Sequence, residues 1–381
     1  MIIGKQKLNF DIKEVSDMIT FQRNPWRSIF ALALVLTIVL LSSPSLYADN
    51  SSYQRHNLVS DGAIQADHTD PKLVNAWGIA FNPNGFAWVA DNGTGTATLY
   101  DGLGNKQSLE VTIPPPAGSP AGTTAAPTGI VFNSSSDFVV TENSKSGPSA
   151  FIFATEDGTI SGWNPSVDAT NAVLAVDNSS SGAIYKGIAI AANGTGHFLY
   201  ATDFHNDKID VFDKDFKAAA LPCSFADPKI SAGFAPFGIQ NINGNLYVTY
   251  AKQDAERVDD VAGKGLGFVD VYDANGCLIR RLVTRGQLNA PWGIALAPAD
   301  FGKFSNNLLV GNFGDGMINA FDLRSGNFRG ALRKGGHPIV VDGLWGIAFG
   351  NGVDNQPVNS LFFTAGPNDE SDGLFGTVEA Q

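Results

Sequence analysis

The sequence predicts an all-β fold, a six-bladed β-propeller built from four-stranded antiparallel blades. Two patterns predict it: a glycine-headed apolar strand recurs six times, and further strands with alternating polarity follow each copy. The composition agrees, because the chain of 381 residues contains 42 glycines and only 16% charged residues. Such a composition favours a large β-rich globule over a helical bundle or a disordered chain.

Residues 1–48 precede the repeats and differ from them in composition. Arg23 and Arg27 come before an apolar run over 29–41, and small residues lead to Ala48. A basic flank, a short apolar run and a small-residue exit are typical of a secretory signal peptide. We therefore expect 1–48 to be a signal peptide and 49–381 to be an exported propeller, periplasmic or extracellular and not embedded in a membrane. An uncleaved membrane anchor is the alternative, and Met18 is a possible true start.

Six glycines mark the innermost strands of the predicted blades. Each lies before an isoleucine in an apolar segment such as Trp77–Phe81, and successive copies recur at similar intervals along the chain. The glycines are Gly78, Gly129, Gly187, Gly238, Gly293 and Gly346. Because a repeat of about 50 residues with four strands is typical of a propeller blade, six copies predict six blades. The missing Cβ suits strands that converge on an axis.

The remaining strands of each unit follow in order. The predicted second strands are Ala87–Ala90, Phe138–Thr141, Phe198–Thr202, Leu246–Tyr250, Leu308–Gly311 and Leu361–Thr364. Third strands alternate, as in Val269–Asp273, and a weaker fourth strand such as Leu278–Val283 closes most units. The last unit ends after its third strand, near Phe375–Val378. We expect His56–Val59 to supply the missing strand and close the ring, leaving no open edge.

Net charge and cysteine content limit the partners and the compartment. The chain carries a net charge of −12, and the segment 1–48 holds five basic and three acidic side chains, which leaves −14 on the rest. An acidic protein lacks the basic footprint of a nucleic-acid binder, so nucleic acid is excluded as a partner. Cys223 and Cys277 both lie in the exported part, where they form either a disulfide or two buried thiols.

Several longer motifs carry a family resemblance that covers 55–378. They are Ala251–Ala255, Asp259–Gly265, Gly267–Val271, Pro291–Pro298 and Gly311–Gly316. The chain resembles a family of uncharacterised exported bacterial propellers, some of which end in an exosortase-type sorting signal that this chain lacks. More distantly, it is similar to NHL-type and senescence-marker-protein/gluconolactonase-type propellers. The resemblance implies a fold and a compartment, and it implies no activity.

Polar residues directly after the second strands are the candidate metal ligands, because these loops share one face of a propeller. The candidates are Asp91, Asn92, Glu142, Asn143, Asp203 and Asn312, with His205 the one histidine in the ring. Carboxylate and amide oxygens suit Ca²⁺ or another divalent cation. The alternatives are direct ligand binding and an ordinary turn role, in which Asp and Asn bond their own backbone.

A charged loop and a set of aromatic residues are the candidate ligand-binding groups. The loop 251–265 interrupts a charge-poor chain, and the aromatic residues directly precede inner-strand glycines. The candidates are Lys252, Asp254, Asp259, Asp260, Trp77, Trp292 and Trp345. The tryptophans either stack on a flat ligand at the channel mouth or fill gaps between blades, and the charged loop is either a site or merely solvated.

Three functions remain open from the residues alone, and they do not decide whether the protein is an enzyme. The leading hypothesis is a ligand-binding or protein-interaction module that uses its loop-rich channel face, most simply as a monomer. The alternative is a divalent-metal-dependent hydrolase of esters or lactones, and the third is a structural role in an envelope or matrix. No GxSxG or nucleotide-binding motif is present in the sequence.

Overall fold

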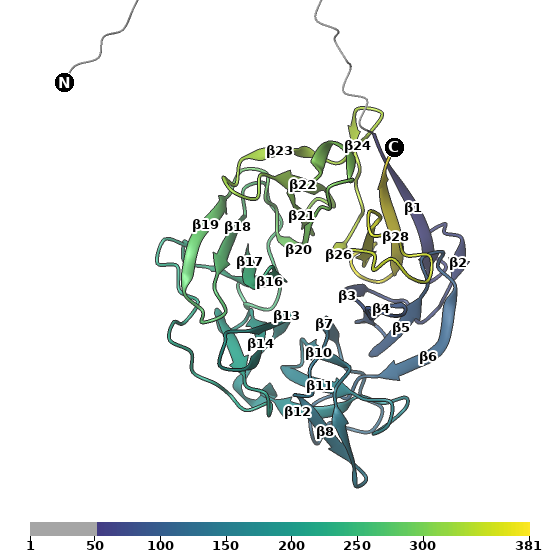
Figure 1. The fold of residues 1–381 in the computed structure, drawn as a ribbon, viewed down its shortest axis with the longest axis vertical. Coiled ribbons are helices and arrows are strands. Elements are labelled where there is room, and N and C mark those ends of the chain that lie inside the picture. Colours follow the sequence, from purple (N-terminus) through teal and green to yellow (C-terminus); the bar gives the residue numbers. More distant parts are fainter. Residues whose placement is uncertain (1–51) are drawn as a thin grey trace, which may run out of the picture. The chain divides into compact units, whose positions relative to one another are not determined.

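The computed structural model describes residues 52–381, which form six sheets arranged around one axis (Figure 1). This arrangement confirms the predicted six-bladed β-propeller. The predicted signal peptide over 1–48 lies outside the described residues. In the part of the chain that is described, no helix is long and apolar enough to cross a membrane.

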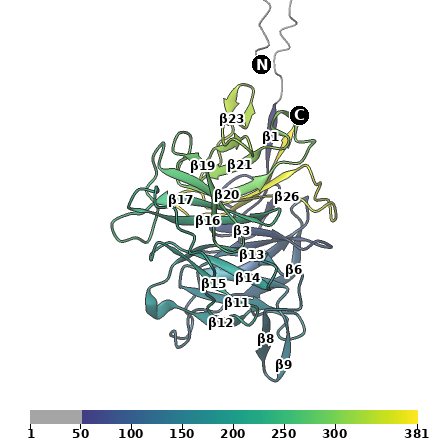
Figure 2. The ribbon, with the colours of Figure 1, turned by 60° about the vertical axis from the view of Figure 1, so that its left-hand side comes forward.

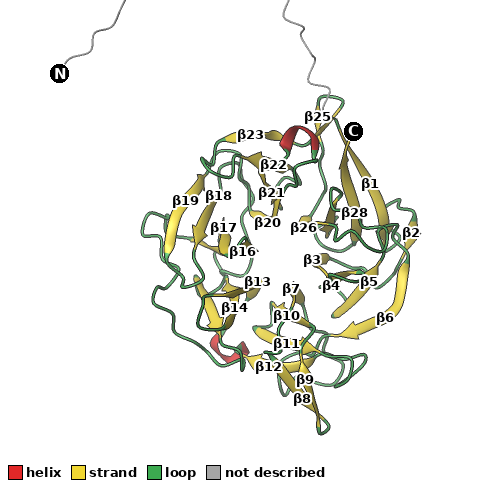
Figure 3. Cartoon of the chain, in the orientation of Figure 1, coloured by secondary structure: helices red, strands yellow, loops and turns green. Residues whose placement is uncertain are grey.

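The strands of each blade pair antiparallel, apart from one short parallel pair at the outer edge of blade six, and the first strand of each blade lies nearest the axis (Figures 1 and 3). Blade one contains β3 (Ala76–Phe81), β4 (Ala87–Asp91), β5 (Thr96–Tyr100) and β6 (Lys106–Thr112). Blade two contains β7 (Pro127–Phe132), β10 (Phe151–Thr155), β11 (Thr159–Trp163) and β12 (Val173–Asp177). Blade three contains β13 (Tyr185–Ala192), β14 (His197–Asp203) and β15 (Lys208–Phe212), and it lacks the predicted fourth strand that closes the other blades.

The other three blades follow the same plan. Blade four contains β16 (Phe234–Ile242), β17 (Asn245–Lys252), β18 (Gly267–Tyr272) and β19 (Leu278–Thr284). Blade five contains β20 (Pro291–Leu296), β21 (Leu308–Asn312), β22 (Ile318–Phe321) and β23 (Phe328–Ala331). Blade six contains β26 (Leu344–Phe349), β27 (Leu361–Ala365), β28 (Leu374–Ala380), β1 (Tyr53–Ser60) and the short β2 (His68–Thr69). Outside the blades lie β8 (Val139–Glu142), β9 (Lys145–Pro148), β24 (Arg333–Lys334), β25 (His337–Pro338) and two 3-10 turns, η2 (Ser179–Ser181) and η3 (Gly302–Phe304).

Strand β1 closes the ring, as the sequence predicts. It pairs with β28 from Tyr53 opposite Ala380 to Ser60 opposite Leu374, so the first and last strands of the described residues lie side by side (Figure 1). The Tyr53 hydroxyl donates a hydrogen bond to the carbonyl of Phe301 at 2.9 Å, which ties the closing strand to blade five. Without β1, the outer edge of β28 would have no strand partner.

The second strand of blade two is the one clear error of the sequence-based assignment. The predicted strand Phe138–Thr141 instead contributes β8, which pairs with β9 in an inserted hairpin that projects from the ring (Figure 2). The true second strand is β10, which is buried along its whole length and lies between β7 and β11. The apolar, β-branched run at 138–141 is typical of a strand, but only one of the four residues of β8 is buried, and β8 pairs with its neighbour in the sequence.

The hydrophobic core is divided among the junctions between blades. Within the described residues, six buried clusters each join two neighbouring blades, and a seventh lies on the axis. The repeated glycines allow the inner strands to approach one another this closely. A Cβ at any of the six would lie between 2.1 and 3.0 Å from the backbone of the next blade's inner strand, for example 2.1 Å from the Trp292 carbonyl oxygen at Gly238.

Cys223 and Cys277 form a disulfide. It joins the segment after β15 in blade three to the turn before β19 in blade four, across 54 residues of sequence. Of the two states left open by the sequence, the structure has the disulfide.

Candidate functional site

Aromatic side chains plug one end of the central channel, the end that carries the long loops. Trp77 and Trp345, which precede inner-strand glycines, are each 1% exposed, and their rings stack with centroids 3.6 Å apart. Phe313 stacks on the other face of Trp345 at 4.0 Å, and Trp292 meets Trp345 edge to face at 5.9 Å. The tryptophans therefore contact one another, and the two that are fully buried have no face open for stacking on a ligand.

Lys186 occupies the position in blade three where four other blades have an aromatic residue. Its side chain is 2% exposed, and its ammonium lies 5.3 Å from the centre of the Trp77 ring. The Nζ atom donates to Glu156 Oε1 at 2.5 Å and to Asp259 Oδ1 at 3.0 Å. Burial alone would lower the pKa of Lys186, but the two carboxylates outweigh it and raise this pKa. The ammonium form of Lys186 is therefore favoured at neutral pH.

A chain of amide and carboxylate groups extends from Glu156 to blade six. Asn92 donates to Glu156 Oε2 at 2.9 Å, and Asn75 donates to Asn92 at 3.2 Å and to Glu370 Oε2 at 2.6 Å. Trp345 Nε1 donates to Asn75 Oδ1 at 3.0 Å, which connects this polar network to the aromatic plug beneath it. Groups from blades one, two and six are thereby linked across the mouth of the channel.

The loop after β17 adds the remaining acidic groups. The amide of Asp254 donates to the carbonyl of Asp259 at 2.8 Å, and Gln253 Nε2 donates to the Phe204 carbonyl at 2.6 Å. These bonds hold Asp259 against Lys186 and place Asp260 in the same cluster. Asp260 Oδ2 is shielded from solvent and has no hydrogen-bond partner among the described residues. Burial raises the pKa of Asp260 to about 7, although Lys186 opposes the shift.

The cluster carries more negative than positive groups. Four carboxyl groups, those of Glu156, Asp259, Asp260 and Glu370, surround the single ammonium of Lys186. The pKa of Glu370 is also raised, first by burial and then by the charge of Glu156. We call these five residues the mouth cluster. An excess of carboxylates with perturbed pKa values is typical of functional sites.

Backbone strain accompanies two residues of this network. Asn75 has φ of 45° and Glu370 has φ of 65°, and Glu370 ends a run of three left-handed residues that begins at Asn368. Left-handed conformations are costly for residues other than glycine and persist where the surroundings hold them. The hydrogen bond between Asn75 and Glu370 thus joins two residues that both have an unfavourable backbone conformation.

The predicted charged-loop and tryptophan candidates divide into two groups in the structure. Asp259, Asp260, Trp77, Trp292 and Trp345 come together at the loop-rich end, where Trp292 Nε1 donates to the carbonyl of Lys186 at 2.9 Å. Asp254 shapes the loop by accepting from the amide of Val258 at 2.9 Å. Lys252 is exposed, and its side chain makes no hydrogen bond or ion pair in the described part of the chain.

The predicted metal ligands do not form a single group. Asn92 belongs to the network above, whereas Asp203 accepts hydrogen bonds from the Ile184 amide and the Asn206 side chain. Asn312 donates to the Gln287 carbonyl, and Asp91 is fully buried with a raised pKa caused first by burial. These contacts support neighbouring turns. Across residues 52–381, no group of three or more His, Cys, Asp or Glu side chains is arranged to hold a metal ion.

Glu142 and Asn143 lie away from the channel because the strand assignment of blade two is wrong. They stand at the tip of the β8–β9 hairpin, where Asn143 has φ of 48° in the connecting turn. The residue that follows the true second strand is Glu156, which the sequence analysis did not select. An Asp-Gly turn directly after it, at 157–158, is a sequence feature that marks the end of this strand.

Glu370 is a second residue that the sequence analysis missed, and Lys186 is a third. The feature that identifies it is the internal repeat itself, because the position before the inner-strand glycine is aromatic in four blades, threonine in one and lysine in one. Glu370 lies in the loop after the second strand of blade six, yet only its backbone conformation brings it to Asn75. Neither Glu156 nor Glu370 could be paired with Lys186 without knowledge of the ring geometry.

Together, the fold and the site define a six-bladed β-propeller with a charged cluster above an aromatic plug. No family model matches the chain. It is 35% identical over 334 residues to an uncharacterized protein of Acanthamoeba polyphaga mimivirus, covering 86% of this chain and 80% of that protein. A second uncharacterized mimivirus protein is 32% identical over 335 residues, covering 86% of each. The chain belongs to the family of these mimivirus proteins. These viral relatives do not support the expected exported bacterial family.

Solved structures show the same fold at low identity. Virginiamycin B lyase from Staphylococcus aureus has a TM-score of 0.50 and 15% identity, covering 87% of this chain and 99% of that one. The soluble aldose sugar dehydrogenase from Escherichia coli has a TM-score of 0.50 and 13% identity, covering 87% and 100%. These likenesses show the propeller fold alone, and they carry no activity to this chain.

Proposed function

We propose that the protein is a binding module that recognises a positively charged group at the mouth cluster. The observation that carries the proposal is the charge imbalance: four carboxyl groups face one ammonium, and one shielded oxygen of Asp260 has no partner among the described residues. A buried polar atom without a partner calls for an explanation, and a bound ligand that donates a hydrogen bond is a direct one.

The geometry suits an ammonium or guanidinium group carried by a small molecule or by a protein side chain. Asp259 remains 66% exposed at its side chain while it contacts Lys186, so an incoming group can reach the cluster from solvent. A cation that bonded Asp260 Oδ2 would both satisfy this atom and offset the repulsion among the carboxylates. Charge-assisted hydrogen bonds of this kind are about twice as strong as neutral ones.

The test uses two probes of the same shape. We expect n-butylguanidinium to bind the full chain in calorimetric titration, whereas the neutral isostere n-butylurea should bind at least tenfold more weakly. Asp260→Asn should remove most of the affinity for butylguanidinium, and the exposed-site control Asp300→Asn should retain it. Equal binding of the two probes, or full binding by Asp260→Asn, would reject the proposal.

A separate arm of the same experiment addresses the divalent-cation hypothesis. If Ca²⁺ raises the melting temperature and butylguanidinium does not, the mouth cluster binds a metal ion. The metal-dependent hydrolase hypothesis then replaces the proposal of a site for an ammonium or guanidinium group. Hydrolysis of a simple lactone that depends on Ca²⁺ and on Asp260 would then be the next measurement. Binding of butylguanidinium without any effect of Ca²⁺ supports the binding module.

We also propose that the protein is exported. Two observations support this: the sequence of 1–48 has the parts of a signal peptide, and the described residues contain the Cys223–Cys277 disulfide. Disulfides persist in oxidising compartments and are rare in the cytosol. Expression of the full chain in a bacterium, followed by fractionation and N-terminal sequencing, should give an exported form that begins near residue 49. A cytoplasmic form that retains residue 1 would contradict the proposal.

A further inference from the structure

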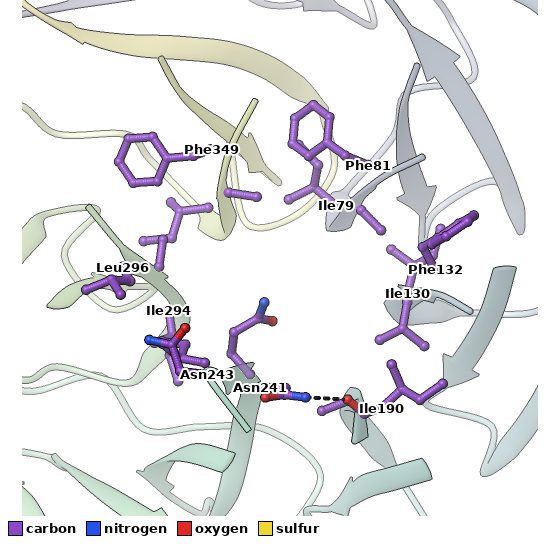
Figure 4. Close-up of a pocket in the computed structure, with 18 residues that line it drawn as sticks. Ile79, Phe81, Ile130, Phe132, Ile190, Asn241, Asn243, Ile294, Leu296 and Phe349 are labelled. Atoms are coloured by element: carbon purple, nitrogen blue, oxygen red, sulfur yellow. Dashed lines mark hydrogen bonds between the residues drawn. The ribbon is translucent and has the colours of Figure 1, made fainter. Parts of the chain in front are cut away.

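The channel end opposite the mouth cluster is open and forms a cavity of about 600 Å³ (Figure 4). The inner strands of all six blades line it, with isoleucines such as Ile79, Ile130 and Ile294 around the wall and Phe81 and Phe349 among its larger side chains. None of its lining residues carries an ionisable side chain. A large concave site with mainly hydrophobic side chains is typical of small-molecule binding.

The internal repeat is broken at one place in this wall. Two and three positions after the inner-strand glycine, five blades have only apolar residues, as in Ala80–Phe81 and Ala348–Phe349. In blade four, the equivalent positions are Gln240 and Asn241. Both line the cavity, so its polar side chains are gathered on the blade-four wall. Because the other five blades pack with apolar residues at these two positions, packing of the inner strand does not require the amides.

The two amides differ in how they are used. The Asn241 side chain donates to the Ile190 carbonyl at 2.9 Å and accepts from the Gly244 amide at 2.9 Å, so it supports the wall and the turn. The Gln240 side chain is exposed and has no hydrogen-bond partner among the described residues. It also lines the narrow part of the channel above the cavity, together with Ile239 and Ile294. Gln240 thus presents a free amide where the cavity meets the narrow channel.

We propose that this cavity binds a neutral, mainly apolar small molecule with one hydrogen-bonding group, which Gln240 engages. A charged ligand is disfavoured because the residues that line the cavity offer no opposite charge. The apolar body of the ligand would contact the ring of isoleucines. Its carbonyl or N–H group would pair with the Gln240 amide. This site is at the opposite end of the channel from the mouth cluster and is independent of the function proposed there.

The first test uses three related probes with the full chain. N-phenyl-1-naphthylamine is neutral and has one N–H group, and its fluorescence should rise with saturation at one molecule per chain. The anionic 1-anilinonaphthalene-8-sulfonate has the same rings and should bind at least tenfold more weakly. In competition, 1-phenylnaphthalene, which lacks the N–H group, should bind about fivefold more weakly than the amine, as expected for one lost hydrogen bond.

The second test uses variants that separate the cavity from nonspecific binding. Gln240→Leu should abolish the preference for the amine over 1-phenylnaphthalene while the chain stays folded, because the Gln240 side chain has no partner to lose in the described structure. Ala348→Trp should fill the cavity and reduce binding of both neutral probes more than tenfold, and the distant control Asp300→Asn should leave binding unchanged. Tighter binding of the sulfonate, or an unchanged preference in Gln240→Leu, would overturn the proposal.

Discussion

The two ends of one channel differ although the same six strands build both. At the loop-rich end, Trp345 of β26 is 1% exposed and stacks between Trp77 and Phe313. Further along the same strand, Phe349 is only partly buried and lines an open cavity. One end is thus filled and charged, and the other is open and uncharged. The inner strands have the same backbone arrangement at both ends of the channel. The two ends differ because different residues stand before and after the repeated glycine.

Departures from the repeat identify both candidate sites. Lys186 replaces the common aromatic residue before the glycine, and Gln240 replaces the common small apolar residue after it. At both positions the equivalent residues of other blades contribute to packing. The charge of Lys186 and the amide of Gln240 are therefore not needed for packing. The lesson is that in a propeller the exceptional copy of a repeated position is more informative than the repeated pattern.

The largest expected effect comes from emptying the aromatic plug. Trp345→Ala should lower the free energy of unfolding by about 4 kcal/mol, because it leaves a cavity beneath the mouth cluster. The matched change on the same strand, Phe349→Ala, should cost about 2 kcal/mol, because that side chain is already partly exposed. Urea denaturation measures both. Equal losses would mean that the two ends are packed alike.

Removing the buried charge should have the next largest effect. Lys186→Met removes the cation that pairs with Glu156 and Asp259. It should lower the free energy of unfolding by about 3 kcal/mol at pH 7, since a buried ion pair that loses one partner leaves an uncompensated charge. The control is Lys214→Met, which removes an exposed pair with Asp215 and should leave the free energy of unfolding nearly unchanged. If the two variants unfold at the same urea concentration, Lys186 does not organise the cluster.

The stability of the mouth cluster should depend on pH through Asp260. Its pKa is raised from 3.8 to about 7, so the folded state holds the proton more tightly than the unfolded state. Protonated Asp260 therefore stabilises the folded state at low pH, and this contribution is lost as the pH rises from about 4 to about 7. Asp260→Asn, which cannot ionise, should therefore be more stable than the unchanged protein at pH 8, by an amount on the order of 2 kcal/mol.

The comparison that checks this effect is made at two pH values. At pH 4 the thermal unfolding of Asp260→Asn and of the unchanged protein should nearly coincide, whereas at pH 8 the variant should melt higher. Asp300→Asn, at an exposed site, should show no such difference. A variant that is less stable at pH 8 would mean that ionised Asp260 contributes favourably to the fold.

The smallest expected effect on stability is at the open end. Gln240→Leu should change the free energy of unfolding by no more than about 0.5 kcal/mol, because the Gln240 side chain is exposed and makes no hydrogen bond in the described structure. Chemical denaturation at pH 7 is sufficient to measure it. A loss as large as that of a typical intramolecular hydrogen bond would show that this side chain supports the wall of the channel. Its ligand role would then need a different explanation.

Much of the fold could be predicted because propeller blades are nearly local units. Each glycine-headed strand and its followers are consecutive in the sequence, so alternation and turn residues identify them. The prediction failed for Phe138–Thr141, because this apolar, β-branched segment looks like a blade strand although it belongs to a hairpin inserted into blade two. A local pattern cannot distinguish a strand that joins a blade from one that pairs only with its neighbour.

The candidate site was less predictable because its parts lie far apart in the sequence. Asp259 and Asp260 were selected from a charged loop, but their partner Lys186 lies 73 residues away from Asp259. Asn75 and Glu370, which hydrogen-bond across the closure of the ring, are separated by 295 residues. Pairs of this kind leave no periodic pattern, since they depend on which loops the closed ring brings to one end.

By itself, the sequence determined the fold class, the number of blades, the strand that closes the ring and the glycines at which the inner strands meet. These features follow from patterns within single blades, where short-range alternation and missing side chains decide the structure. Only the tertiary structure decided that the tryptophans plug one end, that Lys186 lies among four carboxyl groups, and that the other end is an open cavity. The reason is physical: burial, charge pairing and cavity shape arise where residues from different blades meet around the axis.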